Sequence, residues 1–235
     1  TIGDNVTNIG NHALFGMADL TNITVSSSNT HYKDISGVLF DYNETVLIQY
    51  PINYPRTSCE IPESVNTIEE SAFAYAKNLT TVTFAPESQL NSIGFQAFYE
   101  APKLTSINIP ASVTSIQGSS FAGSGLTSIT IPANVTSIGN SAFSGCSSLT
   151  SVTFEAGSSL NSIGAYAFSY MPNLTSITIP ASVTSIGEYA FYGAKSLASV
   201  TFEEGSKLTS IGEHVFQDVI SLTSITIPEG MKTIG

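Results

Sequence analysis

A phenylalanine recurs at nearly constant spacing through most of the chain. The intervals between successive members are 25, 23, 22, 25, 23 and 25 residues. The series is Phe73, Phe98, Phe121, Phe143, Phe168, Phe191 and Phe216. Each closes the same phrase, of which Leu174-Thr-Ser-Ile-Thr-Ile-Pro-Ala-Ser-Val-Thr-Ser-Ile-Gly-Glu-Tyr-Ala-Phe191 is a clean copy. A unit of this length cannot bury its own apolar face, so the pattern predicts a solenoid in which successive units stack.

The phrase also predicts the local structure of one unit. Ile177 and Ile179 share one face of an expected strand, while Ser176 and Thr178 point the other way. Pro180 ends that strand because it has no N–H to donate. A period of 22–25 residues with Leu and Ile at fixed offsets is typical of leucine-rich repeats. We therefore predict a mostly β, α/β-class solenoid: a right-handed superhelix of short strands and short helical turns, with the phenylalanines stacked as an aromatic spine.

The repeats extend to both ends of the chain. Residues 2–10 match the phrase at 179–187, and the chain stops inside another copy at Thr233-Ile-Gly235. We predict one domain over residues 1–235, with about eight to nine repeats of 22–25 residues. Because both ends lie within a repeat, we expect the chain to be a fragment of a longer protein.

One interval breaks the pattern. From Leu14 to Phe73 there are 59 residues, and the surplus lies at about residues 26–60. Two apolar runs between Gly37 and Tyr50 flank Asp41-Tyr-Asn-Glu44, which predicts a β-hairpin insertion. The insertion holds four tyrosines and Arg56, residue types that are enriched in binding hot spots. Alternatively, these strands continue the sheet and pack their aromatic side chains inward.

Charge and cysteine content exclude several classes. The formal net charge is −11, which disfavours nucleic acid and anionic membranes as partners. No apolar run is long enough for a transmembrane segment. Cys59 and Cys146 lie about three repeats apart, on the order of 15 Å along a stack of strands spaced ~4.8 Å, so we predict two free thiols.

The sequence carries no recognisable catalytic, cofactor-binding or metal-binding motif, and we expect a non-enzymatic protein with no cofactor. The three histidines do not cluster along the repeats. Asp41-Tyr-Asn-Glu44 has the oxygen donors for a weak Ca²⁺ site, but a hairpin turn explains these residues better.

Two sets of residues are candidates for partner contact. Outward strand positions are rich in Ser and Thr, which make up about a quarter of the chain, and predict a flat hydroxyl surface on the concave face. The candidates there are Ser106, Asn108, Ser128, Thr130, Ser151, Thr153, Ser176 and Thr178, and those in the insertion are Tyr32, Tyr42, Tyr50, Tyr54 and Arg56. Six further tyrosines lie around the phenylalanine turn, either as an aromatic stripe or as a cover for the core.

The phrase Leu-Thr-Ser-Ile-Thr-Ile-Pro-x-x-Val-Thr-Ser-Ile-Gly-x-x-Ala-Phe resembles the BspA-type leucine-rich repeat over nearly the whole chain. The turn position that is often Cys in that family is filled by Cys only at Cys146. The resemblance implies surface-exposed or secreted proteins of host-associated bacteria and parasitic protists, several of them similar to virulence-associated adhesins for host matrix proteins or other microbes. It implies no catalytic residues.

Three functions remain open. The first is a cell-surface or secreted recognition module that adheres to host or microbial proteins and contacts them through the hydroxyl surface or the insertion. The second is a structural stalk or spacer that presents another domain. The third is a carbohydrate-binding module that uses tyrosines and hydroxyls to bind glycans.

Overall fold

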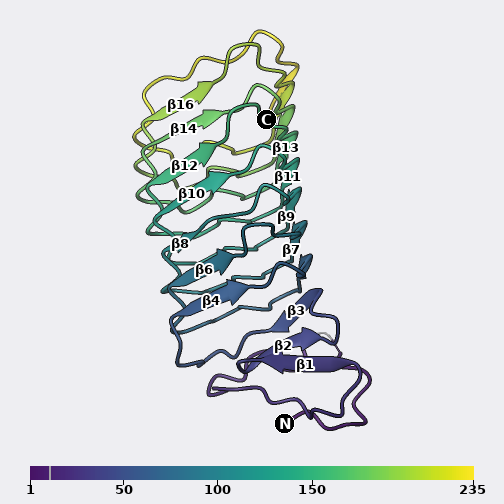
Figure 1. Ribbon diagram of the computed structural model, residues 1–235. Helices are drawn as coiled ribbons and strands as arrows, with labels where there is room; N and C mark the ends of the chain where they lie inside the picture. The colour runs from purple at the N-terminus through teal and green to yellow at the C-terminus, as the bar shows by residue number, and fades with distance from the viewer. Residues whose placement is uncertain (11) are drawn as a thin grey trace.

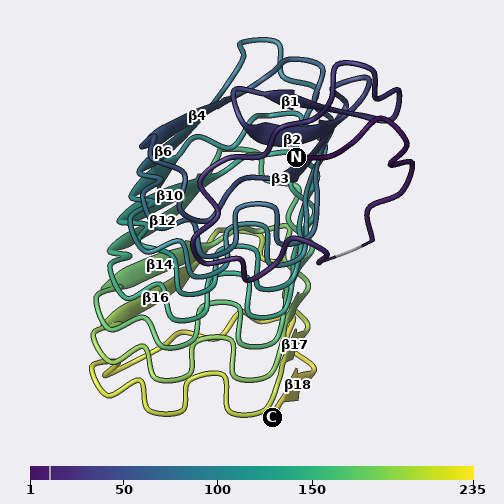
Figure 2. The same ribbon diagram turned by 90° about the horizontal axis from the view of Figure 1, so that it is seen from below.

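The computed structural model describes residues 1–10 and 12–235. The chain winds as a coil whose turns stack along one axis from the N-terminal to the C-terminal end (Figure 1). In the described residues, seven successive turns each contribute one strand to each of two faces. Figure 2 shows the two sets of strands on opposite sides of the coil.

The first face is a single sheet of eleven strands. From β3 onward all its strands are parallel, and from β5 onward their Ser or Thr residues are in register from one turn to the next. Its members are β1 (Tyr32–Ile35), β2 (Val38–Asp41), β3 (Val46–Gln49), β5 (Thr67–Ile68), β7 (Ser92–Ile93), β9 (Ser115–Ile116), β11 (Ser137–Ile138), β13 (Ser162–Ile163), β15 (Ser185–Ile186), β17 (Ser210–Ile211) and β18 (Thr233–Ile234).

The second face consists of three smaller sheets, β4-β6-β8, β10-β12 and β14-β16, and all of its strands except β8 have four residues. All pairs are parallel and in register. From β6 onward Val and Ile point into the core and Ser or Thr point outward, as the alternation in the sequence predicts, whereas in β4 Cys59 points inward and Glu60 outward. The strands are β4 (Ser58–Ile61), β6 (Thr81–Phe84), β8 (Ser106–Ile107), β10 (Ser128–Ile131), β12 (Ser151–Phe154), β14 (Ser176–Ile179) and β16 (Ser199–Phe202).

The predicted phenylalanine spine is confirmed. Neighbouring rings from Phe73 to Phe216 stack with centroids 4.8 to 5.8 Å apart and interplanar angles of 14° or less. The rings from Phe73 to Phe191 are completely buried. The spine thus joins the repeats into one continuous apolar core.

The predicted short helical turns are wrong: the described residues contain no helix. Each phenylalanine turn instead places two residues in the left-handed region, such as Ser141 and Gly145 on either side of Phe143. This alternation prevents a helical run, because helix requires successive right-handed residues. Backbone N–H groups then alternate between a bond within the turn and one to the next repeat. For example, Ser144 N–H donates to Ser141 O, while Phe143 N–H donates to Ala167 O.

The predicted hairpin is present as β2 and β3, and β1 adds a third antiparallel strand. Asp41 fixes the connection, since its carboxylate accepts bonds from Val46 N–H (2.7 Å) and from the Thr45 hydroxyl (2.8 Å). β3 then pairs in parallel with β5, so the insertion continues the large sheet.

The insertion also divides the hydrophobic core. Phe40 and Leu47 pack into the main core, whereas Leu39 and Ile48 pack against the N-terminal repeat with Ile23. Both faces of this short sheet are therefore covered by protein. The insertion is a partition between the first repeat and the rest of the stack.

Candidate interaction surfaces

The predicted hydroxyl surface lies on the second face of the coil. All eight of its candidate residues, from Ser106 and Asn108 to Ser176 and Thr178, are exposed. The surface continues onto β16 with Ser199 and Thr201, and from β8 to β16 no outward strand position carries a charge. Its position on the concave side stays a prediction.

Some of these hydroxyls bond to one another across strands. The Thr130 and Thr153 hydroxyls are 2.9 Å apart, and so are those of Thr178 and Thr201. Between these pairs, a groove of 260 Å³ separates β12 from β14 and is lined by Thr153, Thr178, Phe154 and Glu203, among other residues. The surface therefore combines a flat array of hydroxyls with a recess.

The insertion tyrosines do not act as one group. Tyr50 and Tyr54 are buried, with 1% and 7% of their surface exposed, which corrects their proposed role in partner contact. Tyr50 extends the spine, with its ring 5.0 Å from that of Phe73, and burial raises its pKa. Its hydroxyl donates to Arg56 O, and that of Tyr54 donates to Ser36 O. The alternative in which the aromatic side chains pack inward holds for these two residues.

The other three insertion candidates retain accessible surface. Tyr42 is 50% exposed, but the Lys33 ammonium lies 5.1 Å from its ring centroid. Arg56 is exposed, with its guanidinium 5.8 Å from the ring of Tyr54. Tyr32 is half-buried and its hydroxyl accepts a bond from Ile9 N–H. Only Tyr42 and Arg56 are therefore freely placed for a partner.

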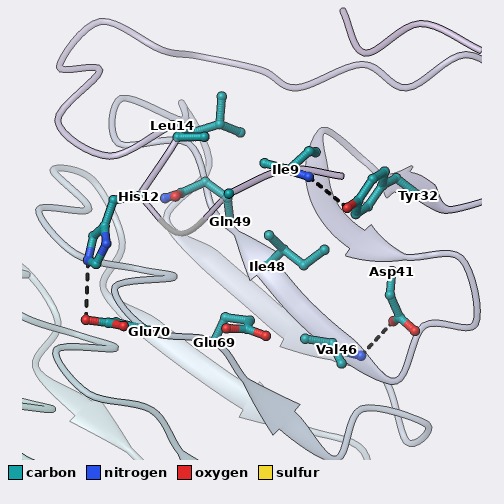
Figure 3. Close-up of a pocket in the computed structure, with 12 residues that line it drawn as sticks. Ile9, His12, Leu14, Tyr32, Asp41, Val46, Ile48, Gln49, Glu69 and Glu70 are labelled. Carbon is teal, nitrogen blue, oxygen red and sulfur yellow. Dashed lines mark hydrogen bonds and ion pairs between the residues drawn. The ribbon is translucent and has the colours of Figure 1, made fainter. Parts of the chain in front are cut away.

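A pocket of 210 Å³ lies between the insertion and the N-terminal segment (Figure 3). Val46 and Ile48 line its apolar side, and Glu69 and Glu70 lie at its lower edge in that view. His12 reaches Glu70, with Nε2 and Oε1 3.4 Å apart. The sequence does not predict this pocket, because the pocket depends on how the first repeat packs over β3.

The tyrosines around the phenylalanine turn form two patches rather than one stripe. Near the N-terminus, Phe15, Tyr75 and Tyr99 contact edge to face. The second patch spans three C-terminal repeats. Tyr189 contacts the rings of Tyr166, Tyr192 and His214, and Tyr192 also contacts Tyr170. Between the patches, the equivalent turn positions carry Ser and Gly.

Both cysteines are free, as predicted, and both are buried. Burial raises the pKa of the Cys59 thiol to about 12 and that of Cys146 to about 11. Neither is therefore an activated nucleophile at neutral pH. Among the described residues, no group of His, Cys, Asp and Glu could hold a metal ion. Nor does any helix in that part of the chain have the length and apolarity to span a bilayer.

Similar solved structures are bacterial leucine-rich repeat proteins. A protein from Eubacterium ventriosum aligns with 99% of this chain at 25% identity and a TM-score of 0.71. A leucine-rich cell surface protein from Faecalibacterium prausnitzii aligns with 99% at 29% identity and a TM-score of 0.55. The chain spans 56% and 67% of their lengths. A protein from T. pallidum, at 23% identity, covers 84% of the chain with a TM-score of 0.68, and the chain covers 89% of it.

A comparison with curated proteins gives no match. A family model for the BspA type leucine-rich repeat region matches in six copies, over residues 1–125, 52–157 and 116–235. Families of this kind are generally non-enzymatic, and leucine-rich repeat domains generally mediate protein interactions. The chain belongs to the BspA-type leucine-rich repeat family.

Proposed function

We propose that this chain is a non-enzymatic recognition module, displayed at a bacterial cell surface or secreted, that adheres to proteins of a host or of other microbes. The observation that carries the proposal is the uncharged hydroxyl surface. It extends over β8 to β16 without a charged outward residue, although the chain as a whole has a formal net charge of −11. An ordered surface free of charge lowers the desolvation cost of contact with a partner.

The surface location is supported by similarity. The Faecalibacterium prausnitzii neighbour is described as a cell surface protein and shares 29% identity with almost the whole chain. Proteins of the host extracellular matrix are the partner class we favour, because they are accessible to a bacterial surface protein.

The proposal is tested by capture of the chain on immobilised host matrix proteins. In the test variant Ser128→Lys/Thr153→Lys, two like charges stand near the centre of the hydroxyl surface. Burying unpaired charges is costly, so we expect capture to weaken by at least about tenfold. Ser148→Lys, at an exposed serine in the turn before β12, is the matched control and should leave capture unchanged.

A second variant, Tyr42→Ser/Arg56→Ser, tests the exposed part of the insertion. If it abolishes capture while the double lysine variant binds normally, the insertion and not the hydroxyl surface makes the contact. If the folded chain is captured by none of the immobilised matrix proteins, the result would count against recognition of matrix proteins.

One observation favours a structural spacer instead. Threonines beside the strands donate their hydroxyls to backbone carbonyls of the preceding repeat, as in Thr127 to Thr105 O and Thr150 to Thr127 O. Many hydroxyls therefore stabilise the stack itself. A spacer would give no specific capture, and its force–extension behaviour would be the property to measure.

A further inference from the structure

Three tyrosines of the C-terminal patch occupy backbone positions that disfavour bulky residues. Tyr166, Tyr170 and Tyr189 have φ values of 57°, 53° and 56°. Left-handed backbone is unfavourable for side chains that carry a Cβ, more so for large ones. Equivalent turns use Ser141 and Gly145 at these two positions. The fold therefore forms without tyrosine there.

Core packing does not account for these rings either. Tyr166 and Tyr170 are 37% and 54% exposed, whereas the adjacent Phe168 is completely buried and supplies the spine contact. A strained backbone position with an exposed aromatic ring is a pattern that points to function rather than stability.

The rings form one connected surface, which we call the tyrosine cluster. Tyr166 stacks on Tyr189 at 4.8 Å and 7°, and Tyr189 stacks on His214 at 4.8 Å and 23°. Tyr192 meets Tyr189 and Tyr170 edge to face, at 5.6 and 5.1 Å. The cluster consists of Tyr166, Tyr170, Tyr189, Tyr192 and His214.

The cluster ends abruptly at the preceding repeat, where the side chains are small. A Cβ added to Gly193 would lie 3.3 Å from the Tyr170 ring, whereas one added to Gly145 would meet no atom of that ring. The Tyr170 ring therefore lies against the following repeat, beside Gly193 and Tyr192. On the same side of Tyr166, the described residues place Ser141 and no aromatic ring at the equivalent position. The rings of Tyr166 and Tyr170 are thus exposed to solvent beside a repeat with small side chains at the equivalent positions.

The charges around the cluster are negative. Glu188, Glu213 and Asp218 are exposed on the second and third of these turns, and residues 164–170, 187–193 and 212–218 include no Lys or Arg. Tyr170 and Asp218 raise the pKa of Tyr192, so this phenol stays neutral. Glu213 lies 4.0 Å from Nε2 of His214, and the cluster therefore combines aromatic rings with an excess of carboxylates.

An arginine side chain matches both features. Its planar guanidinium stacks on aromatic rings and pairs with carboxylates through directed N–H donors. An acidic segment would be repelled, and a neutral one would gain the stacking without the ionic attraction.

We propose that the tyrosine cluster is a docking surface for an arginine-containing segment of a partner protein. This inference rests on the proposed recognition function and assigns it a second surface and a partner chemistry.

The test is a calorimetric titration of the intact chain with a blocked peptide of alternating Gly and Arg. A peptide in which citrulline replaces Arg keeps the shape and removes the charge. The variant Tyr166→Ser/Tyr170→Gly introduces the residue types of Ser141 and Gly145, so its backbone remains compatible with the turn. Phe95→Ser, at another exposed aromatic of a turn, is the matched control.

We expect saturable binding of the arginine peptide that weakens as salt is raised. Cation–π contacts correspond to between about two- and thirty-fold per ring, so the double variant should bind at least about fivefold more weakly. The citrulline peptide should also bind more weakly, and Phe95→Ser should bind like the wild type. Thermal unfolding of each variant confirms that it is folded.

Equal affinity for the arginine and citrulline peptides, or equal binding by the double variant, overturns the proposal. So does binding of a neutral oligosaccharide that the double variant loses, if the arginine peptide does not bind. These outcomes are separable from failure of the recognition function. Matrix-protein capture that persists in the double variant leaves the hydroxyl surface intact and removes only the tyrosine cluster.

Discussion

Individual residues of the phenylalanine turn show how backbone geometry limits the sequence. In the part of the chain that the structure describes, fourteen non-glycine residues have positive φ, and most of them are at the two repeated turn positions. Where glycine occupies one of these positions, as at Gly123 and Gly145, there is no steric penalty. Where a residue other than glycine occupies one of these positions, the left-handed backbone lowers the stability of the folded state locally.

Glu100 allows a direct measurement of this cost. It is exposed, has φ of 49° and is equivalent to Gly123 and Gly145. We expect Glu100→Gly to raise the free energy of unfolding by about 0.5–1 kcal/mol, since relief of the left-handed penalty exceeds the added entropy of the unfolded chain. Chemical denaturation measures the change. Glu63→Gly, in a turn without positive φ, should instead destabilise the protein, and the opposite order would refute the explanation.

Cys146 predicts a pH dependence of stability. Burial raises its pKa from 9.0 to about 11, so the folded state holds the thiol proton more tightly than the unfolded state does. This contribution is complete below pH 9 and is lost as the pH rises through 11, on the order of 1 kcal/mol per pH unit. Cys146→Ala, which introduces the residue type of Ala101 and Ala194, should lose less stability between pH 9 and 11. If the free energy of unfolding of the two proteins falls equally between pH 9 and 11, Cys146 does not cause the pH dependence.

Some residue roles were predictable and others were not. Phe143 and its equivalents follow from spacing, and burial of Cys146 follows from its place in the turn. The left-handed positions were missed because Ser, Tyr, Gln and Glu at these sites carry no common signal. Burial of Tyr50 and Tyr54 was missed as well, since inward and outward packing give the same pattern in a short insertion.

The elements of each repeat are held together by close backbone approach at the corner after the shorter strand. A Cβ on Gly164 would lie 2.6 Å from the Gly139 carbonyl carbon, and one on Gly187 would lie 2.5 Å from Ala165 N. Backbone atoms cannot move aside as a flexible side chain can. Glycine is therefore required at this corner for neighbouring repeats to approach so closely.

We expect Gly164→Ala to lower the free energy of unfolding by about 1–3 kcal/mol, the usual cost of overpacking. Gly3→Ala is the matched control: an added Cβ there meets nothing within 4 Å and the backbone is not left-handed, so stability should be unchanged or slightly higher. Calorimetric unfolding of both variants distinguishes a steric effect from a general preference for glycine.

The insertion shows the limit of pattern analysis for elements. Its two apolar runs predict β2 and β3, but β1 reads Tyr-Lys-Asp-Ile and has no strong alternation. Its sheet has both faces buried, so the strands lack the polar outer side that would have signalled their orientation. Removal of residues 26–60 would expose two cores, and point substitutions are the better test of this segment.

The stack as a unit is coupled through its spine. Because each repeat contacts only its neighbours, a defect in the middle weakens two interfaces and leaves the distant ones intact. Phe143 lies between Phe121 and Phe168, with ring centroids 5.3 and 5.5 Å away.

We therefore expect Phe143→Ala to cost about 3–5 kcal/mol and to broaden the denaturation transition. Phe143→Leu, with the residue type of Leu14, should cost less. A transition that shifts without broadening would show that the stack unfolds as one cooperative unit.

The repeat period, the strand faces and the spine were predictable because they follow from local alternation and from stacking of like units. The division of the core and the two aromatic patches depend on contacts between repeats that differ in sequence. The hydroxyl surface belongs to the first level, since it is common to the repeats, whereas the tyrosine cluster belongs to the second, since it is confined to three of them.

The most direct measurement is amide hydrogen exchange of the chain, alone and in complex with the matrix protein that captures it best. Our interpretation predicts that added protection lies in peptides covering the outward strands from β8 to β16. Protection confined to the opposite sheet, β5 to β17, or no saturable capture by any member of the panel from a folded chain, would contradict it.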